Sequence, residues 1–151
     1  WPSADDEDFK DGTGIDMNDA KVELFDVLFI NCGRAGLVVQ DSISENILVA
    51  TRCEISMCKY GAVAQGSLTS ATFNDCLFHE NNIDGIHGSD HATIHLHGEA
   101  TAIYANDEYG ICARESGKVI IHLPSNHNTT YDNDFEDRLA INGGTITNVE
   151  D

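Results

Sequence analysis

Short apolar segments recur along this chain at a nearly constant spacing. The clearest copies begin at Gly36, Gly61, Gly85 and Gly110, which are 25, 24 and 25 residues apart. A looser fifth copy covers residues 138–142. Apolar positions alternate within each copy with a period of two, which is typical of β-strands rather than helices. A repeat of this length indicates stacked units, each too small to bury its own apolar face.

Two further strands recur with the same period between these copies. One set covers residues 22–24, 48–50, 71–73, 96–98, 121–123 and 146–148; the other covers residues 27–29, 53–55, 76–78 and 101–103. No segment shows a sustained period of 3.6 residues that would indicate a helix. We therefore predict an all-β fold: a right-handed, single-stranded parallel β-helix (solenoid) of about five to six coils with three short strands per coil.

Stacked coils place equivalent residues over one another, about 4.8 Å apart. The predicted inward columns are Leu37, Ala62, Ile86, Ile111 and Leu139, and Val39, Ala64, Gly88, Ala113 and Ile141. The outward column between them consists of Val38, Val63, His87, Cys112 and Ala140. Because this outward column is unusually apolar, we predict that it is a partner-binding face or is covered by the chain itself. Phe9, Ile15 and Met17 are the candidates for such a cover.

Acidic residues concentrate at the two ends of the chain. Residues 1–20 contain seven acids and one lysine, and residues 131–151 contain six acids and one arginine. We assign residues 1–19 to an acidic N-terminal arm or cap and residues 20–151 to the β-helix domain. Residues 125–137 form the one long excursion expected in that domain.

The net charge of −18 restricts the classes of partner. Such a chain repels phosphate backbones and anionic lipids, so we expect no nucleic-acid partner. The sequence has no run of about 18 apolar residues, so we also expect no membrane span. The expected partner is another protein subunit, and a basic one fits the charge.

The five cysteines are odd in number and form no C-x-x-C pair, so we expect reduced thiols rather than a disulfide framework. The predicted stacking places Cys53 over Cys76 and forms a second column from Cys32, Cys58, Asn81 and Asn106. We interpret these columns as small apolar side chains beside an asparagine ladder; a redox or metal-binding thiol pair is the alternative. Reduced cysteines favour an intracellular or organellar compartment.

The motifs Asp75-Cys76-Leu77-Phe78, Asn81-Asn82 and Asp84-Gly85-Ile86 resemble coils of the right-handed parallel β-helix superfamily, the pectate-lyase-like group. The resemblance implies this fold for about 130 residues, but it implies no single activity. The superfamily includes polysaccharide lyases, hydrolases, epimerases and inert solenoids. Residues 122–131 and 143–149 are similar to the ends of small β-helix proteins of microalgae and other protists, which implies a eukaryotic source such as an alga.

A glycan-cleaving enzyme on this fold would need clustered acids, or an acid beside a base. The candidate catalytic residues are Asp84, His87, Asp90 and Arg114, on neighbouring coils. Simpler roles exist for two of them, because Asp84 precedes Gly85 as a turn residue would, and Arg114 is adjacent to Glu115.

Three histidines are candidates for a metal site. His97 and His122 are predicted to point outward from adjacent coils, in one column with Thr72 and Thr147, and His95 shares their face. Imidazoles within one coil spacing could bind Zn²⁺ or Cu²⁺. The alternative is an exposed strand face on which neutral histidines replace threonines. The sequence contains no nucleotide or dinucleotide motif, and we expect no cofactor.

Compact coils, an apolar outward column and scattered catalytic candidates favour a non-enzymatic β-solenoid that acts as a protein-binding or scaffold subunit. A polysaccharide lyase, hydrolase or epimerase of the pectate-lyase-like superfamily, with a glycan as its partner, is the alternative. A histidine-based metal-binding module is a weaker alternative.

Overall fold

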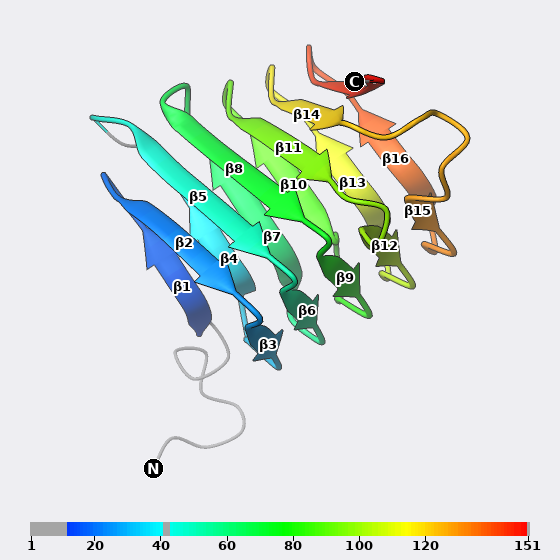
Figure 1. Cartoon of the computed structure of the whole chain (residues 1–151), viewed down its shortest axis with the longest axis horizontal. Coiled ribbons are helices and arrows are strands. Elements are labelled where there is room, and N and C mark those ends of the chain that lie inside the picture. Colours follow the sequence, from blue (N-terminus) through cyan, green and yellow to red (C-terminus); the bar gives the residue numbers. More distant parts are fainter. Residues whose placement is uncertain (1–11, 41–42, 151) are drawn as a thin grey trace.

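The computed structural model describes residues 12–40 and 43–150. Within this part of the chain, seventeen strands form three parallel sheets, which we call sheets A, B and C. The chain passes through A, B and C in turn five times and closes with one more strand in A and one in B (Figure 1). The predicted all-β solenoid of about five coils, with three strands per coil, is therefore confirmed.

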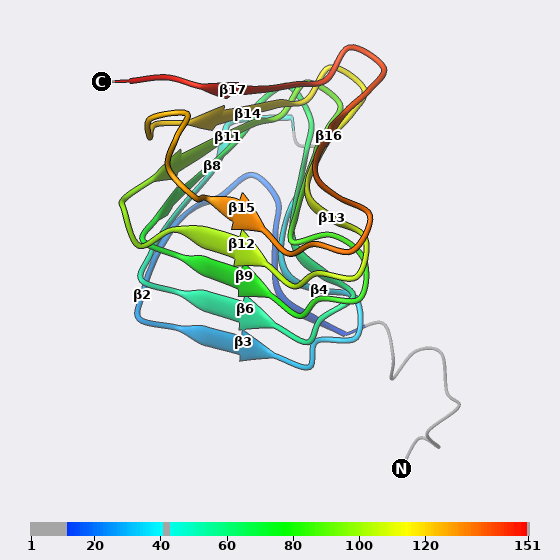
Figure 2. The same ribbon diagram turned by 90° about the vertical axis from the view of Figure 1, so that its right-hand side faces the viewer.

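The strands have these bounds. Sheet A contains β1 (Thr13–Met17), β4 (Ala35–Val39), β7 (Tyr60–Gln65), β10 (Ile86–Ser89), β13 (Tyr109–Ala113) and β16 (Glu136–Ala140). Sheet B contains β2 (Lys21–Phe25), β5 (Asn46–Thr51), β8 (Thr69–Asn74), β11 (Thr93–His97), β14 (Lys118–Ile121) and β17 (Thr145–Asn148). Sheet C contains β3 (Leu28–Ile30), β6 (Glu54–Ser56), β9 (Leu77–His79), β12 (Ala102–Tyr104) and β15 (Thr130–Tyr131), which lie one above another in Figure 2.

The first coil begins earlier than predicted. Strand β1 lies within residues 1–19, which were assigned to an acidic arm, yet it pairs with β4 as a full member of sheet A. Ile15 lies beside Leu37, and Met17 lies beside Val39 and is buried in the core. These two side chains therefore do not cover the outward column, and that prediction was wrong. Phe9 and the rest of residues 1–11 lie outside the described residues.

The inward columns are as predicted through four coils. Leu37, Ala62, Ile86 and Ile111 are register neighbours from β4 to β13, and each is almost fully buried. In the last coil the predicted register is wrong by one residue, because Ile111 pairs with Arg138 and Ala113 pairs with Ala140. Leu139 therefore lies beside Cys112 in the outward column, in the place predicted for Ala140. A shift by one residue moves every side chain to the opposite face.

The error in the register of the last coil arose from residues 125–137. They were predicted to be one long excursion, but they contain β15, which pairs with β12 in sheet C. The fifth coil takes 27 residues to bring Arg138 beside Ile111, whereas the second to fourth coils take 24 or 25.

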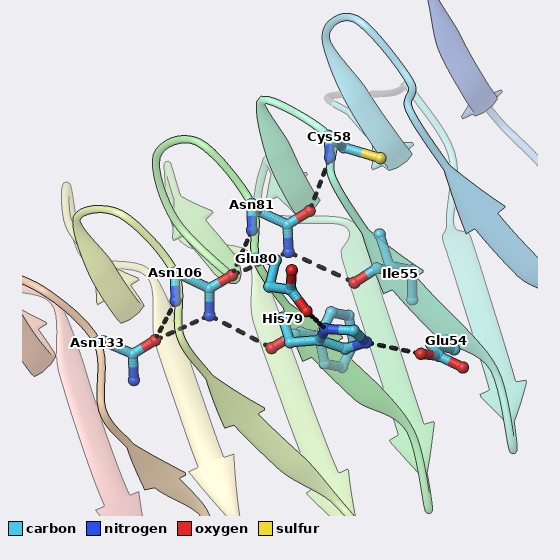
Figure 3. A network of polar contacts seen from close by, with 9 residues as sticks. Glu54, Ile55, Cys58, His79, Glu80, Asn81, Asn106 and Asn133 are labelled. Carbon is cyan, nitrogen blue, oxygen red and sulfur yellow. Dashed lines mark hydrogen bonds and ion pairs between the residues drawn. The ribbon is translucent and has the colours of Figure 1, made fainter.

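A ladder of buried asparagines follows sheet C and joins successive coils (Figure 3). Asn81 Oδ1 accepts a hydrogen bond from the backbone N–H of Cys58 at 3.1 Å, and Asn106 Oδ1 accepts from the backbone N–H of Asn81 at 3.1 Å. Asn133 extends the ladder into the fifth coil. Before the first asparagine, the Cys32 backbone N–H lies 3.3 Å from Cys58 Sγ. The predicted column of cysteines and asparagines is confirmed, and all five cysteines are free thiols.

The C-terminal end of the solenoid is closed by polar side chains in inward positions. Arg138 lies beside Ile111, and Asn148 lies beside Ile121, so both stand over core columns. The Arg138 guanidinium donates from Nη1 to Asn148 Oδ1 at 2.7 Å and from Nε to Thr130 Oγ1 at 3.2 Å. These contacts place a polar lid over two core columns at this end, while Phe135, on the outside of the last coil, is 63% exposed.

The N-terminal end is apolar. Phe25, Leu28 and Ile30, all in the first coil, expose 54%, 57% and 47% of their surface, and Met57 of the second coil is also exposed. We call these four residues the N-terminal apolar patch. Among the described residues, β1, β2 and β3 are the edge strands of their sheets. No helix of the described part is long and apolar enough to cross a membrane.

Candidate functional site

The outer face of sheet A holds a polar cluster formed by Asp84, His87 and Cys112. His87 and Cys112 are register neighbours on β10 and β13, and Asp84 precedes β10. Asp84 Oδ2 lies 3.1 Å from His87 Nδ1, and Asp84 Oδ1 accepts a hydrogen bond from the Tyr109 backbone N–H at 3.2 Å. The ligand atoms of the three side chains all lie within 4.8 Å of one another.

The predicted partner-binding face is not an exposed apolar surface. Val38 and Cys112 expose only 1% and 2% of their surface, while Val63 and His87 are half-buried. The Tyr60 ring packs edge-on against His87, with the ring centroids 5.6 Å apart. Ala140 is exposed but belongs to a different column, for the register reason given above. Side chains of the chain itself thus bury two of the five residues that were predicted to bind a partner.

The candidate catalytic residues lie near the two ends of strand β10 and directly after strand β13. Asp84 and His87 are in contact near the start of β10, but Asp90 is exposed at the corner after that strand, whose four residues span about 13 Å. The paired carboxyl groups of glycosidases are about 5–10 Å apart. Arg114 follows β13, and its positive charge acts on the Cys112 thiol and the Tyr60 hydroxyl, as the Asp84 carboxylate also does. Asp84, His87 and Arg114 therefore lie near one another on the outer face of sheet A, whereas Asp90 does not place a second carboxylate beside Asp84.

The Cys112 thiol is not activated as a nucleophile. Burial raises the pKa of Cys112 to about 11, and the nearby Asp84 carboxylate acts in the same direction. A reactive thiol needs a pKa below its usual range of about 8–9, because the thiolate is the nucleophile. At neutral pH the Asp84, His87 and Cys112 cluster is thus an ordered polar contact with a neutral thiol.

A second cluster, formed by three histidines, lies on the outer face of sheet B. His95 and His97 are alternate residues of β11, and His122 follows β14 on the next coil. The His97 and His122 rings stack with centroids 4.0 Å apart and an angle of 8°, which confirms that they are neighbours. His95 Nδ1 lies 2.9 Å from His122 Nε2, so one ring donates to the other.

The strand residues that pair with His95 and His97 carry no charge. Thr72 lies beside His95 on one side and Ile120 on the other, and Asn74 lies beside His97. Thr147 lies beside Ile120, so the predicted column of Thr72, His97, His122 and Thr147 was wrong by two residues. Burial and the neighbouring imidazoles lower the pKa of His95, which favours its neutral form. His95 also lines an open groove together with Glu45, Leu68 and Thr93, among others.

A third feature, not found from the sequence, is a stack of aromatic rings on the outer face of sheet C. The rings of His79, Tyr104 and Tyr131 are nearly parallel, with centroids 4.9 and 5.1 Å apart. His79 Nε2 lies 2.6 Å from Glu54 Oε1, and its Nδ1 lies 3.0 Å from Glu80 Oε1 (Figure 3). Tyr104 is stacked against a ring on both faces, so it presents only its edge to a sugar ring. In the sequence, His79 and Tyr104 directly follow the predicted segments 76–78 and 101–103, whereas Tyr131 lies in the predicted excursion.

Comparison with known families agrees with this architecture. The family model described as right handed beta helix region matches residues 5–101, which is more than half of the 151-residue chain. No curated protein and no solved structure matches the chain.

Proposed function

The chain belongs to the right-handed β-helix family, and we propose that it is a non-enzymatic member that serves as a protein-binding or scaffold subunit. The observation that supports this proposal is the difference between the two ends of the solenoid. One end is closed by inward polar side chains, whereas the other presents the N-terminal apolar patch beside three edge strands. Edge strands are templates for pairing with another polypeptide unless they are blocked.

The exposed side chains in the patch favour a protein as the occupant. Phe25, Leu28 and Ile30 lie on consecutive strands of one coil and project from its outer face. Large apolar side chains that lie together on a surface mark interaction sites more often than scattered ones do. Removing them from water gives about 25 cal/mol for each Å² of apolar surface buried.

The charge of the chain indicates the chemistry of that partner. Asp16 and Glu23 are exposed acids of the first coil, and the whole chain carries a net charge of −18. A partner with an apolar centre bordered by lysine or arginine side chains would associate faster and more selectively than an acidic one. We therefore propose a basic protein as the occupant of the N-terminal end.

The test compares two variants at opposite ends of the solenoid. The double variant Leu28→Glu/Ile30→Glu places charge in the patch, and Phe135→Glu changes a side chain that is 63% exposed in the last coil. Proteins that copurify with the wild type from its native source are identified, and each candidate is then purified. Its Kd for the three forms is measured by calorimetry.

We expect the double variant to weaken binding at least tenfold, which is about 1.4 kcal/mol, and Phe135→Glu to leave the Kd unchanged. Equal binding by the double variant and the wild type contradicts the assignment to this end. A wild-type chain that self-associates through the patch would show that the occupant is a second copy. A monomeric chain that cleaves an acidic glycan would contradict the non-enzymatic proposal.

A further inference from the structure

We propose that His95, His97 and His122 bind one divalent transition-metal ion of the Zn²⁺ class. This site is independent of the proposed protein-binding end, since it lies on sheet B in the fourth and fifth coils. One nitrogen from each ring can be chosen so that all three lie within 4.8 Å of one another. The three donors come from two adjacent parallel strands, which fix their backbone spacing.

The separations suit a tetrahedral ion after small side-chain rotations. Zn–N bonds of about 2.0–2.1 Å at tetrahedral angles place ligand nitrogens about 3.3–3.4 Å apart. His95 Nδ1 and His122 Nε2 are 2.9 Å apart, and one nitrogen from each of the three rings lies within 4.8 Å of the other two. The His97 and His122 rings stack face to face at 8°, so their in-plane lone pairs are nearly parallel, and an ion between them requires these rings to turn about χ2.

The donor set selects the kind of ion. Three imidazole ligands suit Zn²⁺, Cu²⁺, Ni²⁺ or Co²⁺, whereas Ca²⁺ and Mg²⁺ require oxygen ligands. Three protein ligands leave a fourth position for water or for an incoming group. His95 borders the open groove beside sheet B, so a solvent molecule or a small ligand can reach that position.

The only other group of this kind in the described residues is Asp84, His87 and Cys112. Asp84 and Cys112 are buried there, and both Asp84 oxygens are already engaged by protein groups. The raised pKa of Cys112 also opposes the thiolate that a metal requires. The histidine cluster is half-exposed and needs no buried acid or thiol to ionise.

The test uses the untagged full chain and Zn²⁺ as the probe. Titration is followed by calorimetry and by the imidazole ¹H–¹⁵N signals of the wild type, with Co²⁺ absorption as a separate measure of tetrahedral geometry. Variants His97→Ala and His122→Gln remove ligands in two ways. The matched controls are His91→Ala, an exposed histidine before the same strand, and Cys112→Ala in the other cluster. Thermal unfolding without metal checks that each variant is folded.

We expect one Zn²⁺ per chain and shifts of the His95, His97 and His122 signals without shifts of His91. Loss of either ligand is expected to weaken binding at least tenfold, while both controls bind as the wild type does. The proposal is overturned if wild-type ring signals do not move with Zn²⁺. It is also overturned if Cys112→Ala abolishes binding, or if the ligand variants retain the wild-type Kd. These outcomes do not depend on whether a protein binds the N-terminal patch.

Discussion

Single buried side chains hold neighbouring coils in register, and Asn81 shows how. Its Oδ1 accepts from the Cys58 backbone, while its Nδ2 donates to Ile55 O at 3.4 Å and to Asn106 Oδ1 at 2.9 Å. One amide thus serves the coil before it and the coil after it. Parallel strands end at each corner, and the amide supplies hydrogen-bond partners that the strand ladder does not provide there.

Replacement of Asn81 by alanine is therefore expected to destabilise the fold by about 3 kcal/mol, since buried backbone groups lose their partners. The free energy of unfolding from urea denaturation measures this effect. The neighbouring Asn82→Ala is the control, because Asn82 is exposed and bonds to Cys58 O through its backbone only. Similar stabilities for the two variants would show that the ladder contributes little.

At the scale of elements, a glycine stands at the start of the sheet A strands β4, β7, β10 and β13, as the second residue of β4, β7 and β13 and directly before β10. A β-carbon on Gly61 would lie 2.3 Å from Gly85 O on the next coil, and one on Gly85 would lie 2.8 Å from Gly110 O on the coil after that. The repeated glycine therefore reflects close contact between coils. This explains why glycine was the clearest marker of the repeat in the sequence.

The variant Gly61→Ala is expected to lose about 1–3 kcal/mol of stability, because added volume forces neighbouring backbone apart. The thermal unfolding midpoint should fall while the spectrum of the native state stays β-rich. Gly12→Ala is the matched control, since a β-carbon there meets no atom within 4 Å. If both substitutions have the same effect, the loss is not due to contact between coils.

At the scale of the whole molecule, the two ends of the solenoid differ in the polarity of the side chains that they present to water. Charged residues that point inward at an edge oppose end-to-end pairing of sheets. Arg138 and Asn148 occupy such positions at the C-terminal end, and their mutual hydrogen bond holds them there. We therefore expect the polar end to oppose stacking of coils from separate molecules, and the N-terminal apolar patch is the surface that we propose binds a partner.

Removal of this protection should create a second apolar end. The double variant Arg138→Leu/Asn148→Leu is expected to self-associate, and size-exclusion chromatography with light scattering will show a dimer or larger species. Thr147→Leu adds an apolar side chain to the same strand, β17, but at an exposed position that pairs with Ile120. A monomeric double variant, or equal association of Thr147→Leu, would contradict the assigned role of the lid.

From the sequence, we predicted whether a side chain points inward or outward more reliably than which residue lies beside it on the neighbouring coil. Residues 96–98 and 121–123 were aligned two residues away from their true partners, since Ile94 lies beside Ala71 and Val119 lies beside Ile146. A shift of two residues keeps every side chain on its face, so inward and outward assignments held in those coils. Only the last coil, with its shift of one residue, exchanged the two faces.

The contacts within the candidate sites also include some that the repeat predicts and some that it does not. The stacking of His97 on His122 followed from the repeat, because both lie at the end of a sheet B strand. The contact of His95 with His122, and that of Asp84 with His87, depend on side-chain directions that the period does not specify. The burial of Val38 and Cys112 likewise depends on where neighbouring side chains pack.

The sequence by itself determined the coil architecture, because a period of two within strands and a repeat of 24 or 25 residues between them are local properties. Only the tertiary structure decided the start of the first coil, the register of the last one and the chemistry of the two ends. The physical reason is that a coil can absorb extra residues at any corner. Where they are absorbed depends on which strands then find partners in the neighbouring coil.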